Sequence, residues 1–248
     1  MRKFLLSVLA GALLAPALVL AAGNTTNDSF ARAKKMLGQV YEDHRITLYC
    51  GAEYDAQGNI TLPEGFITPK HEKRAAKIEW EHVVPAENFG RVFEEWREGS
   101  PECVDNRGKT FKGRKCAEKV NAEYRHMQAD MYNLYPAIGA VNALRSNYNY
   151  AMLPGEPSSF GSCEMKIVGN KAEPPARARG QIARIYFYMQ DAYAPRYKMS
   201  RQQEQLMGAW DKMYPVDQWE CTRAKRIEAL QGNENKFVKE PCGEKGMW

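Results

Sequence analysis

Residues 77–85 read KIEWEHVVP, and this stretch decides the fold that we expect. It reads as a short strand over residues 77–84, and Pro85 makes an end to the strand plausible there. The strand carries an adjacent carboxylate and imidazole, Glu81 and His82. A regular strand would point these two side chains to opposite faces. A site that uses both therefore requires the strand to bend or end at this point.

Glu81 and His82 together suggest metal-assisted hydrolysis. An imidazole titrates near neutrality and can take a proton from water, and a carboxylate oxygen is a good ligand for a hard cation. The chain has only 4 His in 248 residues, so one that stands beside an acid at a strand end is conspicuous. The alternative, from these two residues alone, is a surface glutamate beside a packed histidine.

The first 22 residues are typical of a secretory signal peptide. Arg2 and Lys3 precede an uncharged apolar run from Phe4 to Leu20, and small residues follow it. A membrane anchor is the alternative, but the run is short for one. We therefore predict an exported protein, periplasmic or secreted, in which residues 23–248 form one domain.

The cysteines suit an exported chain. All 6 lie after the predicted signal peptide, and an even number in such a chain favours disulfides, although many connectivities are possible. No two have the Cys-x-x-Cys spacing of a zinc or redox site. We predict that Cys103–Cys116 closes a local loop. We further predict that Cys163–Cys221 and Cys50–Cys242 link segments far apart in the chain.

The positive charge of the chain is modest but unevenly distributed. The formal net charge of +5 falls to +3 without Arg2 and Lys3. Lysines and arginines gather at residues 107–119 and 171–184. Such clusters suit a polyanion, and a solvated face is the alternative interpretation.

Capping residues and the spacing of apolar side chains predict several helices. A capping box begins at Ser200, and Pro215 opens a further helix that carries Trp219. The other main helices are expected over residues 29–41, 122–135 and 182–193, and the helix after Ser200 extends to residue 213.

Little of the chain is predicted to be strand. Besides residues 77–84, short strands are expected at 46–50 and 60–62. Residues 97–118 are expected to be a long loop, closed by the predicted Cys103–Cys116 bond. The pattern as a whole indicates one helix-rich α+β domain.

Several motifs in consistent order resemble the bacterial endonuclease I family. They are EWEHVVPA at 79–86, DMYNLYPAIG at 130–139, VN at 141–142 and RSN at 145–147. The resemblance extends through residues 175–180, 186–189 and 214–221, so it covers almost the whole mature chain. The family consists of periplasmic or secreted nucleases that cut DNA and RNA with little sequence preference.

The resemblance implies an α+β fold around a ββα-metal motif with a small antiparallel sheet. Two strands and one helix there hold a single divalent ion, usually Mg²⁺, with Mn²⁺ or Ca²⁺ as substitutes. It further implies that His82 is the general base, that Glu81 and Asn142 are the metal ligands, and that Arg114 stabilises the transition state. Asn133 is expected to be a cap or strut rather than a ligand.

The implied reaction is hydrolysis of double- and single-stranded DNA, and of RNA, that leaves 5′-phosphate ends. Nothing in the sequence signals an interface between subunits, so we expect a monomer. Arg177, Arg179 and Arg184 are candidates for contacts with the nucleic-acid backbone, which would carry no sequence information. One alternative is an exported nucleic-acid-binding protein without catalysis. Another is a metal hydrolase that acts on small phosphoesters.

Overall fold

The computed structural model describes residues 23–248, so the predicted signal peptide at 1–22 lies outside the described residues. Helices dominate the described part, and the strands are short. In chain order the elements are α1 (Phe30–Val40), α2 (Glu72–Ala75), β1 (Ile78–His82), α3 (Ala86–Gly90), α4 (Glu94–Arg97), α5 (Arg114–Val120), α6 (Ala122–Gln128), the 3₁₀ helix η1 (Met131–Asn133), β2 (Leu134–Ile138), α7 (Gly139–Arg145), β3 (Asn149–Tyr150), β4 (Lys166–Val168), β5 (Lys171–Glu173), α8 (Ala176–Ala192), α9 (Arg201–Met213), α10 (Gln218–Gln231) and α11 (Lys236–Glu244).

Strands β1 and β2 form the sheet that matters for the site. They pair antiparallel, with Ile78 opposite Ile138 at one end and His82 opposite Leu134 at the other. All five residues of β2 are buried. Helix α7 follows β2 directly and contacts both strands. The expected arrangement of two antiparallel strands and one helix is therefore present.

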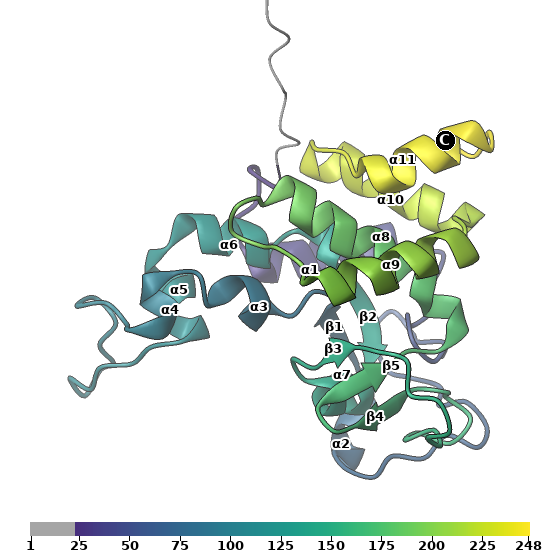
Figure 1. Ribbon diagram of the computed structural model, residues 1–248. Coiled ribbons are helices and arrows are strands. Elements are labelled where there is room, and N and C mark those ends of the chain that lie inside the picture. The colour runs from purple at the N-terminus through teal and green to yellow at the C-terminus, as the bar shows by residue number, and fades with distance from the viewer. Residues whose placement is uncertain (1–22) are drawn as a thin grey trace, which may run out of the picture.

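Long helices cover one side of this unit. Helices α8 and α9 pack against each other, and so do α10 and α11 (Figure 1). The predicted cap at Ser200 is confirmed, because its side chain accepts a hydrogen bond from the backbone N–H of Gln203. A second sheet, in the order β3-β5-β4, lies beyond α7 in the chain, and Figure 1 shows it near α2 and α7.

One predicted helix is shorter than expected. The pattern over residues 122–135 predicts a continuous helix, yet α6 ends at Gln128 and β2 begins at Leu134. The side chain of Asp130 accepts a hydrogen bond from the N–H of Tyr132 and so starts η1 instead. The apolar residues of this region are buried on every side, so their spacing does not reveal a helix face.

Other boundaries differ in smaller ways. The predicted strands at 46–50 and 60–62 form only isolated bridges, Ile46 to Glu53 and Tyr54 to Ile60. Helix α8 starts at Ala176, ahead of the predicted start at residue 182. The loop after α4 ends earlier than predicted, because α5 begins at Arg114. Within residues 23–248, no helix has both the length and the apolar character needed to cross a membrane.

Candidate active site

A cavity of ≈ 690 Å³ lies beside the β1–β2–α7 unit. We call it the cleft, and its walls come from α1, α2, β1, α3, α4, the start of α5, and α7. The lining includes all four residues expected to act in hydrolysis, namely Glu81, His82, Arg114 and Asn142. The fold therefore brings residues 81 and 142, which are far apart in the chain, to one cavity.

Glu81 lies near the end of β1 and is 3% exposed. Its Oε1 atom accepts hydrogen bonds from the Tyr49 hydroxyl at 2.8 Å and from Arg145 Nη1 at 2.9 Å. Burial raises the pKa of the Glu81 carboxyl, while Arg145 and Tyr49 favour its charged form. No side chain or backbone group of the described residues bonds to Oε2, so this oxygen is left for a ligand in the cleft.

Asn142 lies on α7, and its side-chain Nδ2 donates to Glu79 Oε2 at 2.7 Å. A carboxylate only accepts hydrogen bonds, so this contact fixes which end of the amide is nitrogen. The Oδ1 atom has no hydrogen-bond partner among residues 23–248. Like Glu81 Oε2, it is a hard oxygen donor of the kind that Mg²⁺ prefers.

These two oxygens fit a divalent ion that keeps most of its waters, as Mg²⁺ usually does. The described residues contain no group of three or more His, Cys, Asp or Glu side chains with the geometry of a metal site. A centre built from one carboxylate and one amide is not a group of that kind. The donor set therefore fits Mg²⁺ better than zinc, which binds in clusters of Cys and His.

His82 is the last residue of β1, so the strand ends where the shared site requires it to end. Its Nε2 atom lies 2.9 Å from the carbonyl oxygen of Gln128. Because a carbonyl can only accept, Nε2 carries the hydrogen and Nδ1 keeps a lone pair. Burial, together with the charge of Arg114, lowers the pKa of His82 to about 3. The imidazole is therefore neutral at pH 7.

Arg114 opens α5 two residues before Cys116, which is bonded to Cys103. Its Nε atom donates to Gln128 Oε1 at 2.8 Å. Its guanidinium also lies 5.4 Å from the centre of the Phe30 ring. The Tyr124 hydroxyl, which donates to the same Gln128 oxygen, is a second hydrogen-bonding neighbour of the guanidinium. Arg114 lines the cleft, where its guanidinium can meet an anion.

Sequence reasoning missed three residues that hold this site together. Gln128 binds His82 through its carbonyl and Arg114 through its side chain. Arg145 is fully buried and donates to the backbone carbonyls of His82 and Val83, besides Glu81. Tyr49 is the third, through its bond to Glu81. Arg145 had a signal, since it begins the RSN motif and follows Asn142 by one helical turn.

Asn133 does act as a strut. Its amide exchanges two hydrogen bonds with the backbone of Val84, through Oδ1 at 2.7 Å and through Nδ2 at 3.0 Å. This fixes the chain just after β1 against η1. Asn133 lies in η1 and Asn142 in α7, so the two amides belong to different elements.

The three arginines predicted to contact nucleic acid do not line the cleft. Arg177 donates to the carbonyls of Thr47 and Leu48, and Arg179 pairs with Glu173. These bonds are structural, and they offer no evidence for a phosphate contact.

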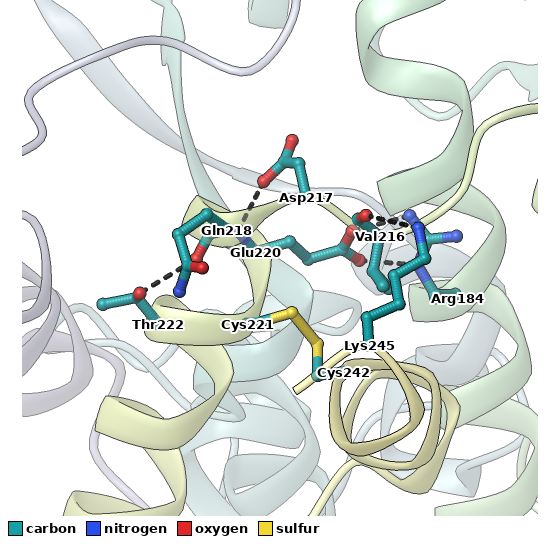
Figure 2. Close-up of a disulfide and its surroundings, with 9 residues drawn as sticks. All are labelled: Arg184, Val216, Asp217, Gln218, Glu220, Cys221, Thr222, Cys242 and Lys245. Carbon is teal, nitrogen blue, oxygen red and sulfur yellow. Dashed lines mark hydrogen bonds and ion pairs between the residues drawn. A yellow bond between two sulfur atoms is a disulfide. The ribbon is translucent and has the colours of Figure 1, made fainter. Parts of the chain in front are cut away.

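For Arg184 the prediction is wrong. Its side chain is 2% exposed, and every guanidinium nitrogen has a partner in Glu220, Asp211 or the carbonyl of Tyr214. Figure 2 shows this guanidinium facing Glu220 at the start of α10. A phosphate has no access to a side chain that is buried and fully bonded.

The disulfides correct two of three predicted pairings. Cys103–Cys116 is confirmed. The other bonds are Cys50–Cys163 and Cys221–Cys242, so the predicted Cys163–Cys221 and Cys50–Cys242 bonds are wrong. Cys221 lies on α10 and Cys242 on α11, and Figure 2 shows the bond between these two packed helices. Sequence alone does not reveal that α11 folds back along α10.

Comparison with known proteins agrees with this geometry. The sequence profile of the Endonuclease I family matches residues 34–242. The chain is 41% identical over 221 residues to an extracellular deoxyribonuclease of Aeromonas hydrophila, covering 86% of this chain and 90% of that protein. A periplasmic deoxyribonuclease of the same organism is also 41% identical, with 86% of each chain covered. Endonuclease-1 of Buchnera aphidicola subsp. Acyrthosiphon pisum (strain APS) is 36% identical over 226 residues, with 89% of this chain and 84% of that protein covered.

The profile match includes every residue that lines the cleft except Phe30, the whole β1–β2–α7 unit and most of the helices that cover it. The match and the identities above together show that this chain belongs to the Endonuclease I family of nucleases.

Proposed function

We propose that this protein is an exported, metal-dependent endonuclease that hydrolyses the phosphodiester bonds of DNA, and of RNA, with little sequence preference. The observation that carries the proposal is the convergence of four chemically suited atoms or groups on one cleft. These belong to Glu81, Asn142, His82 and Arg114, all of which line the cleft. The names of the deoxyribonuclease relatives support DNA as substrate, and their extracellular or periplasmic labels support export.

His82 is the general base in this proposal. Its neutral Nδ1 accepts a proton from the attacking water, a role that typically contributes about 10²–10⁴ in rate. The carbonyl of Gln128 holds the Nε2–H and favours the tautomer that leaves Nδ1 free. The same hydrogen bond stabilises the imidazolium that forms when the proton arrives.

Glu81 and Asn142 hold the divalent ion, which when bound supplies charge relief on the phosphate oxygens. Arg114 stabilises the additional charge that develops on the phosphoryl group, because its planar guanidinium can bind two oxygens at once. The fixed Nε bond to Gln128 orients the guanidinium before the substrate arrives. Attack by water on the phosphorus breaks the bond to the 3′ oxygen and leaves a 5′-phosphate end. The departing 3′ oxygen takes a proton from a water molecule and becomes a 3′-hydroxyl.

Lys34 also lines the cleft, and it replaces Arg184 as a candidate for a contact with the nucleic-acid backbone. Such contacts are electrostatic and independent of sequence. We propose that the enzyme acts as a monomer, since the cleft already contains a complete set of catalytic groups within one chain.

Plasmid nicking tests the proposal. The disulfide-bonded protein should relax supercoiled plasmid in Mg²⁺, with Mn²⁺ or Ca²⁺ tested as substitutes, and a chelator should abolish the reaction. His82→Ala, purified in the same way, should lose orders of magnitude in turnover while it still binds Mn²⁺ by calorimetry. Binding of plasmid without any nicking would favour the non-catalytic alternative. Hydrolysis of a chromogenic diester without cleavage of DNA would favour a small-molecule phosphoesterase.

A further inference from the structure

Glu79 has no role in the proposed chemistry, yet its carboxylate lines the cleft. It lies two residues before Glu81 on β1, so both side chains emerge on the same face of the strand. The Glu79 side chain is 31% exposed, whereas Glu81 is buried. The contacts of Glu79 therefore decide whether it is a solvated surface acid or part of the site.

Glu79 contacts Asn142, one of the two proposed metal ligands. The amide Nδ2 donates to Glu79 Oε2 at 2.7 Å. A terminal amide can rotate by half a turn and exchange its oxygen and nitrogen. A neighbour that only accepts hydrogen bonds favours one of these two orientations. The orientation favoured here directs Nδ2 to Glu79 and leaves Oδ1 for the cation.

Glu79 is itself held in place. Arg74 donates from Nε to Oε1 at 2.7 Å and from Nη2 to Oε2, which is a bidentate contact. The backbone of Gly139 packs closely against both residues. A Cβ atom at position 139 would lie 2.5 Å from the Arg74 carbonyl oxygen and 2.9 Å from Glu79 Oε1. Gly139 is the first residue of α7, so the helix that carries Asn142 comes close to Glu79 only because residue 139 has no side chain.

We propose that Glu79 is a positioning residue that fixes the amide of Asn142 with its oxygen toward the divalent ion, and that Arg74 holds Glu79 in the orientation to do so. The inference rests on the proposed metal site. Residues that hydrogen-bond to a metal ligand orient that ligand, and their loss typically weakens metal affinity or activity about 10–100-fold. Glu79 would thus control how tightly the ion is held without touching the substrate.

The test is the affinity of the DNA-free protein for Mn²⁺, measured by calorimetry on the full disulfide-bonded chain. Glu79→Gln keeps the shape of the side chain but can donate as well as accept, so both orientations of the Asn142 amide become possible. We expect this variant to bind Mn²⁺ about 10–100-fold more weakly. Its kcat at saturating Mn²⁺ should return to within about threefold of the wild type, because the base and Arg114 are unaffected.

Glu87→Gln is the matched control. Glu87 also lines the cleft, but its carboxylate bonds to Asn147 and Arg91 rather than to Asn142. It therefore reports the effect of removing one negative charge from the same cavity. We expect a loss of Mn²⁺ affinity below about threefold, since this interaction is indirect and partly screened. An equal loss of Mn²⁺ affinity in the two variants would mean that Glu79 acts only through its negative charge, and it would overturn the inference.

A double mutant separates positioning from direct binding. In the Asn142→Ala background, Glu79→Gln should weaken Mn²⁺ affinity by less than about threefold, because there is no amide left to orient. A further loss as large as in the wild type would mean that Glu79 binds the ion itself. If Asn142→Ala binds Mn²⁺ like the wild type, the proposed metal site fails and the inference fails with it. If Asn142→Ala loses affinity while Glu79→Gln does not, only the inference fails.

Discussion

The buried pair of Arg145 and Glu81 gives the sharpest prediction about stability. Arg145 is fully buried, and it donates to Glu81 Oε1, to the His82 carbonyl at 2.9 Å and to the Val83 carbonyl at 2.6 Å. Arg145→Met fills much of the same space but removes all three hydrogen bonds and the positive charge. The carboxylate of Glu81 then remains in the protein interior without its cation.

The structure indicates the magnitude of the effect. Removing one partner of a buried ion pair usually costs about 3–5 kcal/mol, because the other charge is left uncompensated. Each buried carbonyl that loses its donor adds to that cost, by about 1–3 kcal/mol if nothing replaces the bond. We therefore expect Arg145→Met to lower the free energy of unfolding by at least about 3 kcal/mol.

The discriminating measurement is a double-mutant cycle with Glu81→Gln. Glu81→Gln alone leaves the buried guanidinium without its anion and should also destabilise the protein. Once Arg145 is gone, the same substitution removes an unpaired buried charge, so it should restore part of the lost stability. We expect the double mutant to be more stable than the sum of the single effects predicts, by about 1–3 kcal/mol.

Urea denaturation of the disulfide-bonded proteins in a chelator provides the assay, since the chelator excludes any stabilisation by metal. Circular dichroism confirms that each variant starts from a folded state. Single effects that add to within about 0.5 kcal/mol would show that Arg145 and Glu81 do not interact energetically. A loss below about 1 kcal/mol for Arg145→Met would refute the reasoning from burial.

Three further predictions concern catalysis, cross-linking and substrate binding. Arg114→Ala should lower kcat by about 10²-fold or more while calorimetric Mn²⁺ affinity stays unchanged, and a defect in metal binding would contradict its assigned role. Removing the Cys50–Cys163 bond, which spans 113 residues, should lower the free energy of unfolding by about 5 kcal/mol in denaturant titrations. Removing Cys103–Cys116, which spans 13, should lower it by about 3 kcal/mol. Equal losses would argue against a chain-entropy origin of the stabilisation. DNA affinity of the His82→Ala protein should fall steeply between low and physiological salt in a fluorescence titration, whereas a flat profile would exclude a phosphate contact by Lys34.

The sequence determined the local features of this protein. The strand predicted at residues 77–84 and the capped helix after Ser200 follow from short-range patterns. The structure contains both, the strand as Ile78–His82. Helix caps and strand ends depend on residues a few positions apart, so a single sequence reveals them. The resemblance to endonuclease I pointed to the four residues that the fold then brings to one cleft.

The tertiary structure decided which groups are free to act and which are not. The sequence suggests that Arg184 is a surface cation. In the structure its side chain is buried and forms an ion pair with Glu220 on α10. Gln128 had no signal, because its carbonyl becomes important only when α6 packs beside His82. Cysteine pairing and the buried Arg145–Glu81 contact likewise depend on segments far apart in the chain. Local sequence patterns determine where helices and strands form. Burial and neighbours that are distant in the chain determine the protonation and hydrogen bonds of each side chain. Those properties in turn determine which side chains can act in the site.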